Sequence, residues 1–178
     1  IFNVDENFIK KNIKMKKILL IVCVSMFFGI IGCNNLQEKK SFDYESEISN
    51  IKDVLESYVI ANETQDIELI QKIWAPDDDI IIFGTKGDEK LIGWEAIRDA
   101  TQEQFNTFEN TLISVRDQVV KINKFGDIAW FSEVINYNFI LDGKARSYEG
   151  IRYTGVLEKR RTDWYIIQSH MSIPAESN

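Results

Sequence analysis

The residues with the most reactive side chains are few in this chain, and their positions exclude several kinds of chemistry. The sequence holds one histidine, His170, and two cysteines, Cys23 and Cys33. One histidine cannot supply a multi-histidine zinc site, and both cysteines precede the expected folded domain. No phosphate loop, dinucleotide fingerprint or nucleophile elbow occurs either. We therefore expect no metal site, no cofactor, no disulfide and no thiol nucleophile in the domain.

His170 is the first candidate for binding or acid–base chemistry. In a regular strand it would share a face with Trp164, Ile166 and Gln168, because side chains alternate between the two faces. If that face lines a pocket, His170 can donate a hydrogen bond to a ligand or act as an acid or base. The alternative is a histidine that is hydrogen-bonded within or beside the core.

Arg152 lies in another strand-like segment, on one face with Tyr148 and Thr154. A buried arginine there would suit a carboxylate ligand or an internal acidic partner, and the alternative is a solvated sheet face. Aromatic residues can line an apolar pocket or pack in the core. The side chains that we predict to contact a small, partly apolar ligand are His170, Arg152, Tyr58, Tyr137 and Trp94.

Acidic residues are weaker candidates in the sequence. Three consecutive aspartates at 77–79 lack the alternating spacing of a calcium loop, so we interpret them as a solvated turn. Asp79, Asp88 and Glu133 remain alternative acids, but no pattern in the sequence places them in a pocket.

Residues 15–33 have the pattern of a bacterial lipoprotein signal peptide. Met15 is followed by two lysines and an apolar run over 18–32, shorter than the roughly 20 residues of a membrane-spanning helix. The run ends Gly-Ile-Ile-Gly-Cys, which resembles a lipobox whose thiol at Cys33 receives the lipid. The alternatives are an ordinary signal peptide and an N-terminal membrane anchor. We predict a lipoprotein of the bacterial cell envelope, anchored in the membrane through Cys33 and facing an extracytoplasmic space.

The rest of the chain reads as one domain. We interpret residues 1–14 as a non-native upstream extension, 34–42 as a polar tether, 43–174 as the domain and 175–178 as a tail. The formal net charge is −7, and the segment before Cys33 is net positive, so the domain is more acidic still. This charge disfavours nucleic acid as a partner, because phosphate binding needs clustered lysine and arginine.

Hydrophobic periodicity predicts an α+β domain with its helices first. Apolar residues recur at helical spacing over 48–62, after a cap at Asp66, and after Gly93. Strand patterns follow at about 79–83, 90–92, 111–122, 128–141, 145–159 and 164–173. Gly150 and Gly155 inside the fifth strand suggest bulges or bends. We expect a curved antiparallel sheet wrapped around three helices, forming a cone whose mouth is a natural ligand site.

Several segments resemble the SnoaL-like branch of the nuclear transport factor 2 superfamily, over about residues 45–174. They are Gly-Trp-Glu-Ala-Ile at 93–97, Gly-Asp-Ile-Ala-Trp at 126–130, Arg-Tyr-Thr at 152–154 and the final strand at 164–172. The final strand is also similar to that of the association domain of calcium/calmodulin-dependent protein kinase. The resemblance implies a cystatin-like cone and a homodimer formed through the uncovered face of the sheet.

The resemblance leaves the function open, because fold does not imply function. Ketosteroid isomerases of this superfamily use an aspartate base on the hairpin before the third helix, where this chain has Gly84. Our leading hypothesis is non-catalytic binding of a small ligand in the cone. The alternatives are an acid–base enzyme of the isomerase, cyclase or lyase type, and a structural or dimerisation module of the envelope.

Overall fold

The computed structural model describes residues 42–174. The expected signal peptide, the lipidation site at Cys33, most of the tether and the tail lie outside the described residues. None of the helices in the described part is long and apolar enough to cross a membrane.

Three helices form where periodicity and caps predict them. In α2 (Tyr44–Thr64), the Asp43 side chain accepts a hydrogen bond from the backbone N–H of Ser46 and so caps the first turn. Asp66 caps α3 (Ile67–Ile73) in the same way, through the N–H of Leu69. The third helix, α4 (Trp94–Thr107), begins after Gly93, whose φ of 84° lies in the region that favours glycine.

Six strands form one curved, unclosed sheet in the order β2-β1-β6-β5-β4-β3. The two short strands, β1 (Ile81–Phe83) and β2 (Lys90–Ile92), are joined as a hairpin. The four long strands form a meander: β3 (Glu109–Ile122), β4 (Ile128–Leu141), β5 (Lys144–Arg160) and β6 (Asp163–Ser172). The strand predictions are confirmed within a few residues.

The sheet is mixed, which corrects the expectation of a purely antiparallel one. Strand β1 pairs with β6 in parallel, and Phe83 lies opposite His170. The connection between them contains β2, α4 and three long strands, so no tight turn forces the pair to be antiparallel. The hairpin and the meander have the short connections on which the antiparallel prediction depended, and both are antiparallel.

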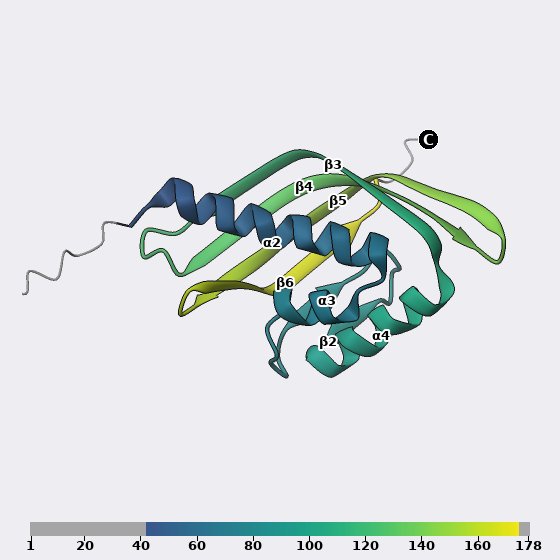
Figure 1. Ribbon diagram of the computed structural model, residues 1–178, viewed down its shortest axis with the longest axis horizontal. Helices are drawn as coiled ribbons and strands as arrows, with labels where there is room; N and C mark the ends of the chain where they lie inside the picture. Colours follow the sequence, from purple (N-terminus) through teal and green to yellow (C-terminus); the bar gives the residue numbers. More distant parts are fainter. Residues whose placement is uncertain (1–41, 175–178) are drawn as a thin grey trace, which may run out of the picture. The chain divides into compact units, whose positions relative to one another are not determined.

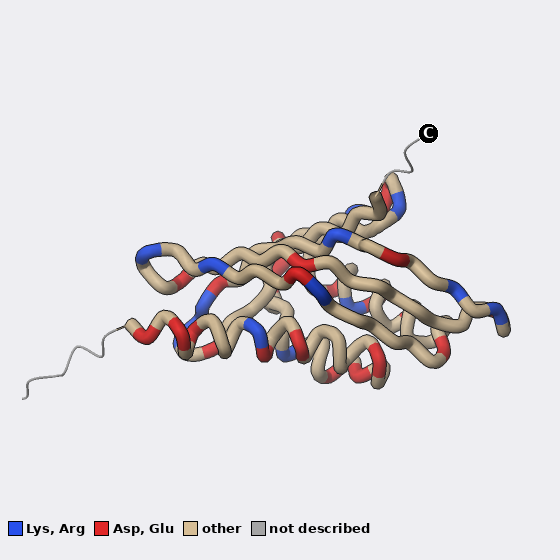
Figure 2. Tube along the Cα trace, turned by 90° about the horizontal axis from the view of Figure 1, so that it is seen from above, with Lys and Arg blue, Asp and Glu red and all other residues tan. Residues whose placement is uncertain are grey.

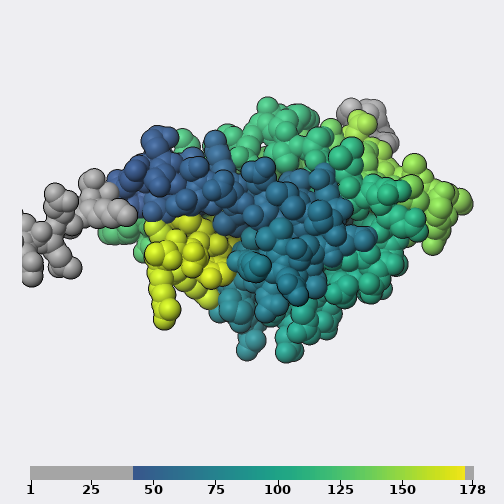
Figure 3. All heavy atoms as spheres, in the orientation of Figure 1, coloured from purple at the N-terminus to yellow at the C-terminus, as the bar shows by residue number. Residues whose placement is uncertain are grey.

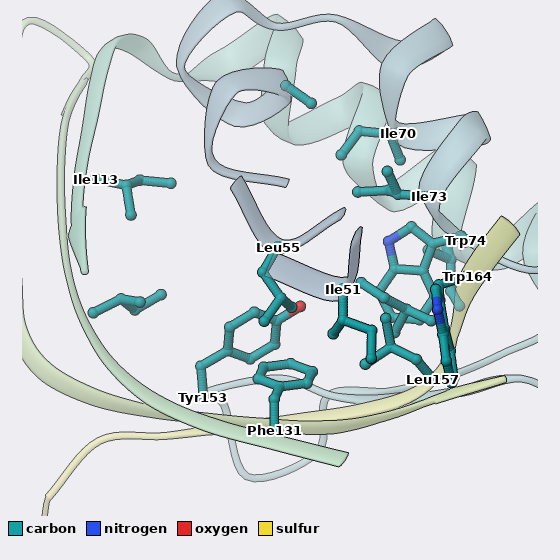
Figure 4. Packing of buried hydrophobic residues seen from close by; sticks show 14 of the residues in the cluster. Ile51, Leu55, Ile70, Ile73, Trp74, Ile113, Phe131, Tyr153, Leu157 and Trp164 are labelled. Atoms are coloured by element: carbon teal, nitrogen blue, oxygen red, sulfur yellow. The ribbon is translucent and has the colours of Figure 1, made fainter. Parts of the chain in front are cut away.

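The helices cover one face of the sheet and leave the other uncovered. Figures 1 and 2 show α2 running along the concave face, with α3 and α4 beside it. Figure 3 shows how closely α2 and α3 pack over this side of the domain. Apolar residues from both layers meet in the core, where Ile51 and Leu55 of α2 lie beside Phe131 and Tyr153 of the sheet (Figure 4).

Four β-bulges interrupt the pairing of the long strands. In β3 one lies between Glu109 and Leu112 and another at Asp117 and Gln118, opposite Glu133, and in β6 one lies at Ile167. The bulge in β5 contains Gly150, which has a φ of 69°, so the predicted bulge at this glycine is confirmed. At each bulge the extra residue reverses the alternation of the side chains that follow it.

Candidate functional site

A cluster of polar side chains lies inside the domain, between α2 and the concave face of the sheet. We call it the inner site. Its centre is Glu133 on β4, which is only 3% exposed and points inward between the buried residues Phe131 and Ile135. The side chains that make up the inner site are Tyr58, Gln118, Glu133, Tyr153 and Ser169.

Glu133 is an acid without a basic partner. Its Oε2 atom accepts a hydrogen bond of 2.8 Å from the side-chain amide of Gln118. None of the lysines, arginines or the histidine within residues 42–174 forms an ion pair with it. Burial raises the pKa of the Glu133 carboxyl, and the hydrogen bond from Gln118 offsets only part of this rise. The carboxyl therefore holds its proton more readily than an exposed glutamate does.

Tyr153 brings an unpaired hydroxyl group to the inner site. The side chain is fully buried, and its hydroxyl makes no hydrogen bond with any described residue. Figure 4 shows this hydroxyl pointing from β5 toward the helix layer, beside Leu55. Burial and the nearby charge of Glu133 raise its pKa far above the ordinary value, and the Ser169 hydroxyl, which lies near it without forming a hydrogen bond of good geometry, lowers it in part. The group is a neutral phenol that can donate or accept one more hydrogen bond.

Aromatic rings surround these polar groups. The Tyr58 ring on α2 lies 5.1 Å from the Tyr153 ring, and the Phe131 ring meets Tyr153 edge-on at 4.9 Å. Burial also raises the pKa of Tyr58 well above its usual value, and Glu133 adds to the effect. Gly155 makes this packing possible, because a Cβ atom there would lie 2.6 Å from the Phe131 ring. The inner site is thus a polar centre with apolar, aromatic walls.

The bulge in β3 directs Gln118 toward Glu133. Asp117 has a φ of 55°, an uncommon conformation for a residue other than glycine. Because Asp117 and Gln118 together face Glu133, the extra residue turns the Gln118 side chain inward. Bulges of this kind often orient side chains at functional sites.

The concave face is incompletely covered beside the inner site. Val115 lies opposite the buried residue Ile135 and so faces inward, yet it is 39% exposed. Gln118 and Tyr58 are both half-buried, and both belong to the inner site. Solvent therefore reaches this edge of the site between α2 and β3.

His170 and Arg152 lie outside the cone, which corrects the expected geometry. Trp164 and Ile166 point inward as predicted, but the bulge at Ile167 reverses the alternation, and Ser169 becomes the inward residue. His170 then faces the convex side, where it is exposed. Arg152 is exposed on the same side and lies opposite Ser172, two residues beyond His170. Their predicted contact with a ligand remains a prediction, but it cannot occur inside the cone.

The other three predicted residues are scattered. Tyr58 belongs to the inner site. Tyr137 is buried in an adjoining network, in which its hydroxyl donates to Asn62 and accepts a 2.8 Å hydrogen bond from Gln104. This network joins the ends of α2 and α4 to β4, and burial raises the pKa of Tyr137. Trp94 is half-buried at the start of α4 and makes no ring contact with the inner site.

Within residues 42–174, two of the pockets that open on the surface lie away from the inner site. One has a volume of about 520 Å³ and lies beside the β1–β2 hairpin, with Phe83, Glu89 and His170 in its walls. The other, of about 960 Å³, lies between α2, α3 and the β5–β6 turn. Gly84, the position at which the sequence comparison expected an aspartate base in isomerases, lies on the same hairpin. The carboxyl group of Glu89 occupies the space that a side chain at Gly84 would need.

The sequence contained one usable signal for the inner site. Glu133 interrupts an inward-facing series that is otherwise apolar, Ala129, Phe131, Ile135 and Tyr137, and such an interruption marks a buried acid. Tyr153 carries no comparable signal, because tyrosine is ordinary in a core. Gln118 could not have been found, since its orientation depends on a bulge.

Comparison with solved structures places the fold. A nuclear transport factor 2-like superfamily protein from Salmonella enterica serovar Typhimurium LT2 has a TM-score of 0.69 at 15% identity, covering 76% of this chain and 96% of that one. A candidate calcium/calmodulin-dependent protein kinase II association domain from Xanthomonas campestris has a TM-score of 0.61 at 22% identity, covering 71% and 87%. A candidate scytalone dehydratase from Novosphingobium aromaticivorans has a TM-score of 0.65 at 11% identity, covering 73% and 85%.

These likenesses are too distant in sequence to show more than the fold. No curated protein matches the sequence significantly. The family model of the SnoaL-like domain matches residues 51–176, which is most of the chain and includes every residue of the inner site. The chain therefore belongs to the SnoaL-like domain family, within the nuclear transport factor 2-like fold.

Proposed function

We propose that this domain binds a small, partly apolar ligand at the inner site and does not transform it. The observation that carries the proposal is the Tyr153 hydroxyl, which is buried and lacks a hydrogen-bond partner among the described residues. An unpaired buried polar group costs about 1–3 kcal/mol, so a bound ligand that pairs with it recovers this loss. The aromatic walls and the uncovered edge at Val115 agree with a ligand that is apolar in part.

Closing the uncovered edge tests this proposal. Val115→Trp places a large ring between α2 and β3, whereas Leu112→Trp places the same ring on an outward-facing position of the same strand that is 61% exposed. We expect the full chain to bind the neutral fluorescent dye N-phenyl-1-naphthylamine, and we expect Val115→Trp to weaken binding at least tenfold. Leu112→Trp should bind as the wild type does. Equal binding by both variants, or no binding by the wild type, would contradict the proposal.

An acid–base enzyme is the second candidate, and one observation favours it. Acids that act in catalysis have pKa values raised toward neutrality, and burial raises that of Glu133. Against it, the phenols of the inner site hold their protons tightly, and His170 and Arg152 are not available to complete a pair there. Mass analysis of a ligand that copurifies, before and after long incubation, distinguishes the two. A change of mass that Glu133→Gln abolishes would favour the enzyme.

We also propose that the domain forms a homodimer through the convex face of the sheet. No helix within residues 42–174 covers this face (Figure 2). Its middle row runs from Phe83 through His170, Thr154 and Ser132 to Val119. This row mixes apolar and small polar groups and contains no acid, lysine or arginine, so it fits a second copy of itself.

Sedimentation at micromolar concentration tests the dimer. Val119 is 48% exposed on the convex face, and Val119→Arg would bring two charges together across a symmetric interface. We expect the wild type to sediment as a dimer and this variant as a monomer. A wild type that sediments as a monomer would contradict the proposal.

The membrane anchor is part of the proposal as well. We infer from the lipobox-like sequence that Cys33 carries a lipid and holds the domain at an extracytoplasmic membrane surface of a bacterial envelope. Cys33→Ala should abolish incorporation of labelled palmitate, whereas Cys23→Ala should not. Equal labelling of Cys33→Ala and the wild type would exclude the anchor.

A further inference from the structure

Glu133 and Tyr153 together define the charge of the ligand that the inner site can accept. Within residues 42–174, Glu133 is the one acid or base among the residues that are more than nine-tenths buried, apart from the tyrosines. The other two buried polar side chains, Asn62 and Ser169, are neutral. The inner site therefore contains a group that can become negative and no group that can become positive.

An isolated carboxylate is costly inside a protein, and a cation beside it removes much of that cost. A lone buried charge loses its hydration and shifts its protonation instead of staying ionised. An ion pair of good geometry offsets this loss, particularly when further hydrogen bonds complete it. Glu133 receives one side-chain hydrogen bond within residues 42–174, from Gln118, so its carboxyl group can accept further ones.

The surroundings of Glu133 suit an ammonium group. The Tyr153 hydroxyl has an unused lone pair that can accept an N–H, and an ammonium group has several N–H donors to distribute. The Tyr153 ring, directly opposite Glu133 on the adjacent strand, packs against the Tyr58 ring, and aromatic rings attract cations. An anionic ligand would be repelled both by Glu133 and by the net charge of −7.

We propose that the inner site takes a small organic cation, a primary or secondary amine on an apolar body, with its ammonium group between Glu133 and Tyr153. The inference rests on the proposed function, since it names the chemical class of the ligand that the inner site binds. It replaces the acidic ligand that His170 and Arg152 would have favoured, because both lie on the convex face.

A matched set of probes tests this inference on the full chain. The set consists of 2-phenylethylamine, 2-phenylethanol and phenylacetate, together with their naphthyl counterparts, which differ in charge on the same apolar bodies. We expect calorimetry to show at least tenfold tighter binding of an amine than of its alcohol, and no binding of the carboxylate. Glu133→Gln should weaken amine binding ten- to a hundredfold, the usual loss for a hydrogen bond to a charged group. The same variant should weaken alcohol binding much less than amine binding.

Two controls keep the result interpretable. Glu103→Gln removes an exposed carboxylate of α4 and should leave the affinity for amines unchanged. Thermal unfolding of Glu133→Gln checks that the variant is folded. If an alcohol binds as tightly as its amine, the inference is overturned while the proposed function stands. If the dye binds and none of the probes does, the inference fails alone, whereas loss of dye binding as well rejects both.

Discussion

Two glutamates of this domain are largely withdrawn from solvent, and only one of them has a cation beside it. Glu47, in the first turn of α2, bonds to the Lys159 ammonium group and accepts a 2.8 Å hydrogen bond from the Trp164 indole. Glu133, on the concave face, has a neutral amide as its only polar partner among the described residues. The Glu47 carboxylate joins α2, β5 and β6 and has both a cation and a hydrogen-bond donor beside it. The Glu133 carboxyl has no cation beside it within the described residues.

The two surroundings move the pKa values of the carboxyl groups in opposite directions. Burial alone would raise the pKa of Glu47, but the hydrogen bonds from Lys159 and Trp164 outweigh it and lower the pKa. Burial dominates at Glu133 and raises its pKa. A satisfied ion pair indicates a structural role, whereas an unsatisfied acid beside an unpaired hydroxyl indicates room for a partner from outside.

The largest effect is expected from removing Glu47. Glu47→Ala leaves Lys159 and the Trp164 indole without their acceptor in a place where the side chains are 20% exposed or less. We expect the free energy of unfolding at pH 7 to fall by about 2–4 kcal/mol in urea titrations. Glu45→Ala is the control, because this exposed acid of the same turn interacts mainly with the helix dipole and should cost about 0.3–1 kcal/mol. Similar losses in both variants would show that the interactions of Glu47 with Lys159 and Trp164 contribute little to stability.

Glu133→Gln should have the opposite sign. The amide keeps an acceptor for Gln118 and removes a carboxyl that is costly to ionise. We expect the free energy of unfolding at pH 7 to rise by roughly 1–3 kcal/mol, the size of a buried group's desolvation penalty. Glu103→Gln should change it by less than about 0.5 kcal/mol. A destabilised Glu133→Gln variant would mean that the ionised carboxylate is well solvated or paired in the native protein.

The stability contributions of Glu133 and Glu47 should depend on pH in opposite ways. The raised pKa of Glu133 means that the native state binds its proton more tightly, so its contribution to stability is present below the unfolded pKa and lost as pH rises through the folded one. The lowered pKa of Glu47 gives a contribution present above the unfolded pKa and lost as pH falls through the folded one. Urea titrations from pH 3 to pH 8 should show the gain from Glu133→Gln growing with pH. The loss from Glu47→Gln should shrink toward acid pH, and parallel curves would refute the assignment.

The smallest effect is expected from Tyr153→Phe. The hydroxyl has no partner among the described residues, so its removal should leave stability unchanged or raise it by up to about 1 kcal/mol. Tyr137→Phe is the matched comparison, because that hydroxyl bonds to Asn62 and Gln104, and its loss should cost about 1–2 kcal/mol. If Tyr153→Phe costs as much as Tyr137→Phe, the Tyr153 hydroxyl has a partner in solution.

The local pattern of the chain determined its elements and their order. Apolar spacing located the three helices, and Asp66 marked the start of α3 because a short acidic side chain can bond the free N–H groups there. Alternation and turn residues located the strands, and the resemblance to SnoaL-like domains is confirmed by the family match. The anchor at Cys33 also derives from sequence alone and stays a prediction. These features depend on neighbours along the chain, so no knowledge of the tertiary structure was needed.

Which side chains come into contact depends on the tertiary structure. One extra residue at Ile167 placed His170 on the convex face, and another at Asp117 turned Gln118 toward Glu133. Bulges arise from pairing with the adjacent strand, and a single inserted residue reverses every position beyond it, so alternation read from one strand cannot anticipate them. The parallel pairing of β1 with β6 and the contact of Tyr58 with Tyr153 join segments distant in the sequence. For that reason the cone was predictable from the sequence, whereas the residues that line its interior were known only from the fold.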